Sequence, residues 1–558
     1  MHRPSRPFHP VVPGIGRARP GTALLVAATS SLLTLTVGLT GAAAAAPGHG
    51  PGTTPAAAPG PAAHGPARHC PVSADAPKRQ LRGEWIASVV NIDWPSRPGL
   101  SVQQQKDELV GWYDEAVARG LNSVVVQVRP TADTFWPSDR EPWSRYLTGT
   151  PGKDPGYDPL AFAVRQAHQR NLEFHAWFNP YRVSMDTDRD ALAPDSPART
   201  HPDWVVAYGG KLYYDPGLPA VRRHVEAVIM EAVRRYDIDA VHFDDYFYPY
   251  PSGGQDFPDA ETFATYGEGF DDIGDWRRHN TDLLVSELNR RIHAAKPWVK
   301  FGVSPFAVWR NAGTDPEGSA TTAGAETYDD LYADTRGWVR KEWLDYIAPQ
   351  VYWNIGFDPA DYAVLVPWWS DQVRGTDVAL YIGQATYKVG TSSQDPAWDD
   401  PREMTKHLDF NAAHPQVDGD IYFSAKDVRA NRLDHMDLLQ ADHYRHPALI
   451  PVTQGVPGHR PGPVHRVTVR RTADGVRLTW RDDAAGYAVY RVSGRGDRCV
   501  TADAEHLLTY ERAEAGSSAT RRHSYVDTTA PARGRVTYYV TALDRAYRES
   551  VPRRITLR

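Results

Sequence analysis

A short apolar stretch of strand length followed by a helical segment recurs eight times through most of this 558-residue chain. Strict alternation of strands and helices favours a parallel sheet, and eight such units favour a closed (β/α)8 TIM barrel. A doubly wound open sheet is the alternative, but it usually carries a glycine-rich phosphate loop after its first strand, and we find none there. We therefore predict an α/β fold with a TIM barrel over residues 78–447.

The connections between the predicted elements differ in length at the two ends of the barrel. Turns from helix to strand are short, whereas four connections from strand to helix are long: residues 130–157, 180–218, 247–275 and 306–330. Long loops in compact domains usually serve a function, and the strand-to-helix loops of a barrel surround its active site. The asymmetry indicates a barrel that carries out chemistry.

Polar side chains gather near the C-terminal ends of the predicted strands. Alternation places His242 and Asp244 on one face of their strand and Val241 and Phe243 on the other. Packing alone does not explain polar residues that converge from seven strands, because each buried polar group would need a partner. The candidates from the strand ends are Gln127, Arg129, His175, Trp177, Asn179, His242, Asp244, Ser304, Gln350, Tyr352, Gln384 and Ser424.

Asp244 is the best-placed ionisable candidate, and we expect it to serve as nucleophile or general base. A retaining glycosidase sets its two carboxyl groups about 5–5.5 Å apart, and an inverting one about 6.5–9.5 Å. Asp245 is the adjacent candidate for the second catalytic carboxyl, with a loop cap as its alternative role. Other candidates for the acid are Asp259, Glu268 and Asp358. Arg129, His175 and His242 are expected to bind hydroxyl groups, to orient Asp244 or to bind a substrate carboxylate.

Composition narrows the range of partners. The net charge of −6 favours neither nucleic acid nor an anionic membrane surface. The 17 Trp and 28 Tyr residues supply flat amphipathic rings that suit sugars, although aromatic packing in the core is the alternative. Two cysteines, Cys70 and Cys499, exclude a cysteine-based metal site and leave a disulfide open. We expect no metal and no cofactor.

The N-terminus resembles a secretory signal. Arginines precede an apolar run from Thr22 to Gly41, small residues follow, and no acidic residue occurs before Asp75. We predict a signal peptide over residues 1–46, a disordered Pro/Ala/Gly linker over 47–77, and a secreted or cell-wall-associated protein without a membrane span after cleavage. An uncleaved anchor is the alternative.

The alternation of strands and helices ends before the C-terminus. Residues 448–462 are rich in Pro and Gly and predict a linker. The remaining residues, 463–558, contain five short predicted strands separated by turns, which suggests a small β-sandwich. The order of the Trp and Tyr strands resembles a fibronectin type III module, which would space or tether the barrel.

Long segments of the barrel resemble the glycosyl hydrolase-like 10 family, over about residues 80–445. The segments are RGEWIA (82–87), NIDWPS (91–96), QVRP (127–130), EPWS (141–144), HAWFNPYR (175–182), HFDDYFYP (242–249), GVSPF (302–306) and APQVYW (348–353). The resemblance implies a TIM barrel and glycoside hydrolysis, with some members acting on bacterial cell-wall glycan stripped of peptides. These segments add the substrate-binding candidates Tyr181, Arg182, Tyr246, Tyr248 and Trp353.

The leading interpretation is a secreted glycoside hydrolase that acts on peptide-free peptidoglycan glycan or a related amino-sugar polymer. One alternative is a carbohydrate-binding surface protein built on an inactive barrel. The other is a metal-dependent polysaccharide deacetylase, but that chemistry favours histidine ligands at helical spacing, and no His-x-x-x-His occurs in the sequence.

Overall fold

The computed structural model describes residues 70–73, 75–391, 395–513 and 521–558. The predicted signal peptide and most of the predicted linker at 47–77 lie outside these residues. In the described part of the chain, every helix is too short or too polar to cross a membrane.

Eight parallel strands close into a barrel, which confirms the predicted fold class. The strand order around the ring is β1-β11-β10-β9-β8-β7-β3-β2. The strands are β1 (Leu81–Ile86), β2 (Ser123–Arg129), β3 (Glu173–Phe178), β7 (Ala240–Phe243), β8 (Lys300–Val303), β9 (Tyr346–Ile347), β10 (Ala379–Gln384) and β11 (Val417–Tyr422). Strand β9 is shorter than predicted because it leads into Pro349, which has no N–H to donate.

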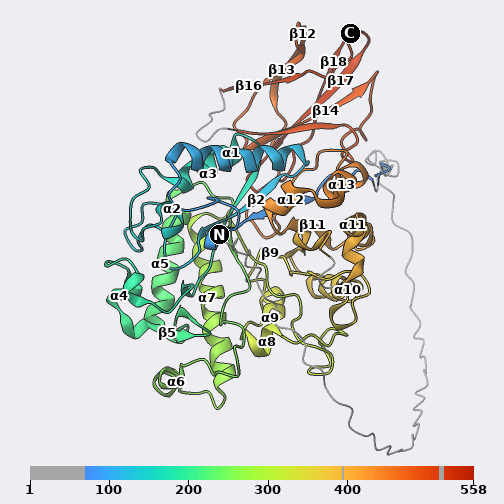
Figure 1. The fold of residues 1–558 in the computed structure, drawn as a ribbon. Helices are drawn as coiled ribbons and strands as arrows, with labels where there is room; N and C mark the ends of the chain where they lie inside the picture. Colours follow the sequence, from blue (N-terminus) through green and yellow to red (C-terminus); the bar gives the residue numbers. More distant parts are fainter. Residues whose placement is uncertain (1–69, 74, 392–394, 514–520) are drawn as a thin grey trace, which may run out of the picture. The chain divides into compact units, whose positions relative to one another are not determined.

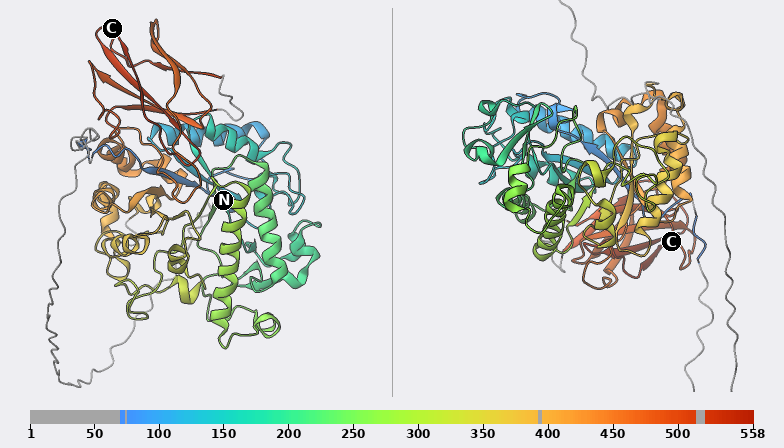
Figure 2. Two further views of the ribbon diagram at one scale, coloured as in Figure 1. Left: turned by 180° about the vertical axis from the view of Figure 1, so that it is seen from behind. Right: turned by 90° about the horizontal axis from the view of Figure 1, so that it is seen from below.

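Helices follow the strands on the outside of the barrel (Figure 1). The main helices are α1 (Val102–Ala118), α3 (Pro159–His168), α5 (Pro219–Arg235), α7 (Ile273–Ala295), α9 (Thr335–Arg340), α10 (Tyr362–Val373), α11 (Glu403–Ala412) and α13 (His435–His443). Asp158 caps α3 by accepting a hydrogen bond from the backbone N–H of Ala161, as its sequence predicts. Helices α5 and α7 run side by side (Figure 2).

Each barrel strand has one face toward the lumen and one toward the helices. The lumen-facing apolar cluster is Leu81, Trp85, Ala87, Val125, Trp177, Ala240, Tyr346, Ala348, Tyr381 and Ile421. Gly302 makes room for one of these rings, since a Cβ atom there would lie 2.1 Å from the ring of Tyr346. The outward faces, with residues such as Val241 and Phe243, pack against the helices in the main core.

The long strand-to-helix connections carry structure of their own. After β3 the chain forms a three-stranded antiparallel sheet of order β4-β6-β5. Its strands are β4 (Arg182–Ser184), β5 (Val205–Tyr208) and β6 (Lys211–Tyr214). The short helices are α2 (Arg145–Thr148), α4 (Pro197–Thr200), α6 (Ala260–Tyr266), α8 (Thr327–Asp330) and α12 (Ala425–Ala430).

The C-terminal region forms two antiparallel sheets, consistent with a β-sandwich. One sheet contains β12 (His465–Thr472), β13 (Gly475–Arg481) and β16 (Arg522–Asp527); the other contains β15 (Leu507–Arg512), β14 (Gly486–Ser493), β17 (Val536–Leu543) and β18 (Arg553–Leu557). Val476, Trp480, Tyr487 and Val540 are among the residues of their shared core. Strands β15 and β18 were not predicted from the sequence, and the fibronectin type III assignment stays a prediction.

Covalent and ionic links join the C-terminal sheets to the rest of the chain. Cys70 and Cys499 form a disulfide with a Cα–Cα distance of 5.3 Å, so the pairing left open by the sequence is present. Arg512 on β15 forms an ion pair with Asp239, the residue before β7. Arg545 forms a second ion pair with Asp237 at 2.8 Å.

Candidate active site

Asp244 follows the last residue of β7 and lies at the C-terminal end of the barrel. Its side chain is almost buried, with 5% of the residue exposed. The Nδ2 group of Asn179, which follows β3, donates to both carboxyl oxygens of Asp244 at 3.2 Å. The backbone N–H of Tyr246 donates to Oδ1 at 3.3 Å. Two neighbouring strand ends therefore fix this carboxyl group.

Asp245 is also buried, but it is held by different partners. The hydroxyl group of Tyr250 donates to Oδ2, and Nε2 of Gln350, beyond β9, donates to Oδ1 at 3.1 Å. Gln350 also donates to the backbone oxygen of Ser304 at 2.8 Å. Four consecutive strands of the barrel ring, β3, β7, β8 and β9, thus contribute to one site at the predicted end of the barrel.

Burial raises the pKa of both carboxyl groups. Burial, followed by the neighbouring charge of Asp245, raises the pKa of Asp244 from 3.8 to about 6. Burial likewise raises the pKa of Asp245, against the hydrogen bonds from Tyr250 and Gln350. The charge of Arg182 opposes the rise in both groups. The charge of Asp245 disfavours ionisation of Asp244, so Asp244 holds its proton to higher pH than an ordinary carboxyl group.

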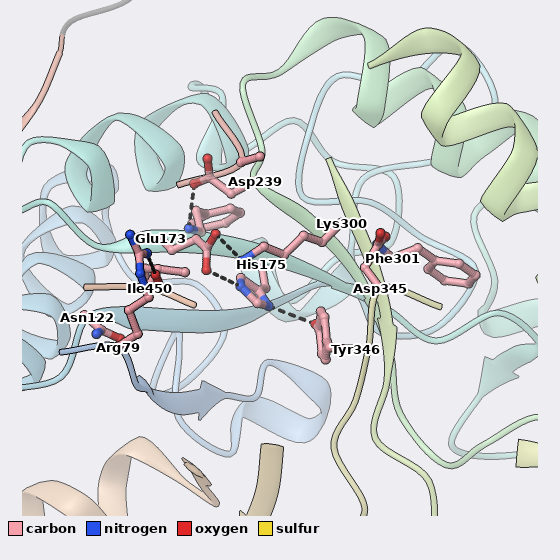
Figure 3. Close-up of polar contacts among 12 residues, drawn as sticks. Arg79, Asn122, Glu173, His175, Asp239, Lys300, Phe301, Asp345, Tyr346 and Ile450 are labelled. Atoms are coloured by element: carbon pink, nitrogen blue, oxygen red, sulfur yellow. Dashed lines mark hydrogen bonds and ion pairs between the residues drawn. The ribbon is translucent and has the colours of Figure 1, made fainter. Parts of the chain in front are cut away.

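A chain of hydrogen bonds crosses the barrel lumen beneath the carboxyl groups. The indole N–H of Trp85 donates to Nε2 of His242 at 3.1 Å, and Nδ1 of His242 lies 2.9 Å from the hydroxyl group of Tyr346. That hydroxyl lies 2.8 Å from Nδ1 of His175. Nε2 of His175 lies 3.1 Å from Glu173, which accepts from Lys300 at 2.8 Å. Figure 3 shows the lower part of this chain, from Tyr346 to Lys300.

The donor at one end fixes the protons along the chain. An indole nitrogen only donates, so Nε2 of His242 is unprotonated and Nδ1 carries the hydrogen toward Tyr346. The hydroxyl of Tyr346 then donates to His175, whose Nε2–H faces Glu173. Burial lowers the pKa of His242 well below its ordinary value, in agreement with a neutral ring. His175 and His242 therefore stabilise the barrel lumen below the carboxyl groups through hydrogen bonds and do not contact those groups.

Arg182 and aromatic rings flank the carboxyl groups at the mouth. The backbone N–H of Arg182 donates to Oδ1 of Asn179 at 3.0 Å, and its guanidinium lies 4.9 Å from the centre of the Tyr246 ring. Tyr352 packs edge-on against Tyr387. Trp353, the next residue in the chain, is partly exposed like Tyr352 and packs edge-on against Phe306. Aromatic faces beside carboxyl groups suit a sugar ring.

Several predicted substrate-binding residues pack in the core or bond other protein groups instead of facing the carboxyl pair. Arg129 is fully buried and forms a two-pronged ion pair with Glu141, at 2.7 and 2.6 Å, so it supports the loop after β2. Tyr181 belongs to the main hydrophobic core. Tyr248 packs in a separate aromatic cluster with Phe257. Trp177 faces the lumen and packs edge-on against His242, and Ser304 bonds the same histidine at 2.9 Å.

Gln384 was predicted on the wrong face of its strand. In β10 the lumen-facing residue is Tyr381, which puts Gln384 on the outer face by alternation. Its amide bonds Tyr362 on α10 at 2.9 Å and His407 on α11 at 2.9 Å. Gln384 therefore joins a strand to its covering helices and lies outside the site. Ser424, which bonds Asp93 at 2.8 Å, also has no contact with the carboxyl pair.

Sequence reasoning missed Tyr250, Tyr213 and Lys211. Tyr250 lies one residue beyond the aromatic segment that ends at Pro249, so extending that segment would have found it. Tyr213 and Lys211 lie on β6, in a loop whose position depends on pairing with β4, and no local pattern marks them. The described residues hold no group of three His, Cys, Asp or Glu side chains that could bind a metal ion.

Paired carboxyl groups of perturbed pKa at the mouth of a parallel barrel, with aromatic rings beside them, are what hydrolysis of a glycosidic bond requires. The fold and the site, taken with the relatives below, define a glycoside hydrolase. Residues 80–400 match the family described as Glycosyl hydrolase-like 10, and the chain belongs to that family.

Two named relatives agree with this class. The chain is 49% identical over 482 residues to glycosyl hydrolase YngK of Bacillus subtilis (strain 168), covering 85% of this chain and 92% of that protein. It is 42% identical over 373 residues to glycosyl hydrolase DigH of Escherichia coli (strain K12), covering 63% of this chain and 84% of that protein. The PgaB (BpsB) glycoside hydrolase domain of Bordetella bronchiseptica has a TM-score of 0.45 and 13% identity, over 66% of this chain and 99% of that chain.

Proposed function

We propose that this protein is a secreted glycoside hydrolase whose substrate is peptide-free peptidoglycan glycan or a related amino-sugar polymer. The observation that carries the proposal is the position of Asp244 at the C-terminal end of β7, held by Asn179 and adjacent to Asp245. Both carboxyl groups are buried at the strand end with raised pKa values, and the charge of Asp245 contributes to the shift of Asp244.

The two carboxyl groups take different roles in the proposed reaction. Asp244 accepts hydrogen bonds from Asn179 and from the backbone N–H of Tyr246, which favour its ionised form. We assign it the role of nucleophile or general base. We assign Asp245, the adjacent buried carboxyl group, the role of the acid that donates a proton to the leaving oxygen, because cleavage requires one carboxylic acid beside one carboxylate.

Secretion and the identity of the polymer are supported indirectly. The N-terminal sequence has the order of charged, apolar and small residues of an export signal. The disulfide between Cys70 and Cys499 suits an oxidising compartment. The peptidoglycan substrate follows from the family resemblance, and the aromatic rings at the mouth are compatible with it.

The test is to incubate the purified protein with purified peptide-free glycan strands and to identify the products by mass spectrometry. We expect shorter glycans from the wild type and a loss of rate of about 10²–10⁴-fold or more in Asp244→Asn. The matched control is Asp271→Asn, which changes an exposed aspartate in the loop after β7. Undiminished activity of Asp244→Asn would reject the assignment, and binding of glycan without any product would favour a carbohydrate-binding protein.

A further inference from the structure

Arg182 is a buried cation without an ion pair. Only 4% of the residue is exposed, and the side chain makes one hydrogen bond to protein, from Nε to the backbone oxygen of Pro130 at 3.2 Å. Across the described ranges of the chain, no carboxylate pairs with it. Buried charges are normally paired, and Arg129 nearby shows the usual solution, with two bonds to Glu141. The unpaired charge of Arg182 therefore points to a binding partner that is not part of the described chain.

The guanidinium of Arg182 has unused donors, and its charge acts on the catalytic carboxyl groups. A guanidinium has five N–H donors, and the terminal nitrogens of Arg182 are not among the buried polar atoms that lack a partner, so they reach solvent. The guanidinium stacks over Tyr246. Its charge also opposes the effect of burial on the pKa of Asp244 and Asp245. The stacking on Tyr246, two residues after Asp244, and the backbone bond to Asn179, which holds Asp244, place Arg182 at the mouth beside the carboxyl groups.

Lys211 places a second cation on the same face. In the β4-β6 pairing Arg182 lies opposite Tyr213, and Lys211, two residues before Tyr213, shares its face. Within the part of the chain that the structure describes, Lys211 has no ion pair either. Burial, and then the charge of Arg182, lowers the pKa of Lys211. Arg182 and Lys211 are thus two cations on one face of the small β4-β6-β5 sheet.

We infer that Arg182 and Lys211 bind a carboxylate carried by the sugar next to the scissile bond. The inference rests on the proposed function and names one feature of its substrate: the glycan is acidic. The planar fork of arginine matches a carboxylate with two parallel hydrogen bonds, and the partly exposed ring of Tyr246, beneath the guanidinium, offers a flat surface for the sugar that carries it. The carboxylate can belong to a lactyl ether on an amino sugar or to a uronic acid.

The test compares two forms of one substrate. Peptide-free peptidoglycan glycan is used with its lactyl carboxylates free, and after their conversion to methylamides, and kcat/KM is measured for both. A charge-assisted pair predicts that the wild type prefers the free acid by about 10- to 100-fold. Arg182→Gln should reduce this ratio to about one, and Lys211→Gln should reduce it by a smaller factor. Hyaluronan carries its carboxylate on a uronic acid. Cleavage of hyaluronan by the wild type would therefore indicate a uronic acid, rather than a lactyl ether, as the source of the carboxylate.

The control is Arg145→Gln, which changes an exposed arginine that is paired with Asp186 at 3.5 Å; it should leave the ratio of acid to amide unchanged. Equal cleavage of both forms by the wild type, or a preference that survives in Arg182→Gln, overturns the inference and leaves the proposed function standing. Failure of the wild type to cleave any of the glycans rejects both. If Arg182→Gln does not fold, the ratio in Lys211→Gln, which changes only the partly exposed start of β6, decides.

Discussion

Replacing Asp244 by Asn should stabilise the folded protein at neutral and alkaline pH while it removes activity. Burial and Asp245 raise the pKa of Asp244 from 3.8 to about 6, a difference of about two units. Each unit corresponds to about 1.4 kcal/mol, so ionised Asp244 lowers the free energy of unfolding by about 3 kcal/mol above pH 6. Asn keeps the shape of the side chain and an oxygen for Asn179 and the N–H of Tyr246.

The sign of the pH dependence follows from which state binds the proton more tightly. Because the pKa is higher in the folded state, this carboxyl group destabilises the fold increasingly as pH rises from about 4 to 6, and fully above pH 6. At pH 4.5 the penalty is about 1 kcal/mol. The advantage of Asp244→Asn should therefore be largest at pH 8 and shrink to about a third at pH 4.5.

Thermal unfolding monitored by calorimetry at pH 8 and pH 4.5 measures this difference. The residues from Cys70 onward form one compact unit of about 490 residues, for which the entropy of unfolding is about 1 kcal/mol/K. We expect the Tm of Asp244→Asn to exceed that of the wild type by about 3 °C at pH 8. Asp271→Asn should change neither value. A variant that is less stable at pH 8, or whose advantage does not shrink in acid, would refute the reasoning.

Three further predictions concern the pH profile, the lumen and the link to the C-terminal sheets. Activity on glycan should rise with pH through about 6, because Asp244 must be ionised; a profile that is flat from pH 5 to 7 would contradict its role. Tyr346→Phe should lower the free energy of unfolding by about 1–3 kcal/mol, since two buried histidines lose their shared partner; in a urea titration Tyr381→Phe, the neighbouring lumen tyrosine, should shift the midpoint much less. Arg512→Ala should lower the free energy of unfolding by about 1.5–3 kcal/mol, because Asp239 loses its arginine and keeps only His168 and the backbone N–H of Phe174; an unchanged Tm would contradict this contribution.

The barrel was predictable because its signals are local. Each strand or helix is marked within a short stretch of sequence by apolar periodicity and by caps such as Asp158. Eight repeats of strand and helix then leave a closed barrel as the favoured topology. The position of Asp244 followed from alternation along one strand. Gln384 failed by the same rule, since a one-residue error in phase moves a side chain to the opposite face. The pairing of β10 with β11 contains a register shift between Leu380 and Tyr381, which the sequence does not reveal.

Contacts between distant residues could not be predicted. The sequence predicts Arg129 as a substrate ligand, but the structure pairs it with Glu141. Arg182 is the opposite case, because only the structure shows that this arginine lacks a carboxylate partner. Lys211 comes near the site through strand pairing in a loop, and the two cysteines are 429 residues apart. These relations depend on the path of the whole chain rather than on any short pattern.

The disulfide between Cys70 and Cys499 has a consequence for damage to the protein. One cysteine precedes β1 and the other follows β14, so the bond turns the barrel segment into a covalent ring. A protease that cuts once in any of the long loops at the mouth opens the ring but releases no fragment. The two pieces stay attached and can keep their packing, so a nicked molecule runs at full mass on a non-reducing gel and separates only after reduction.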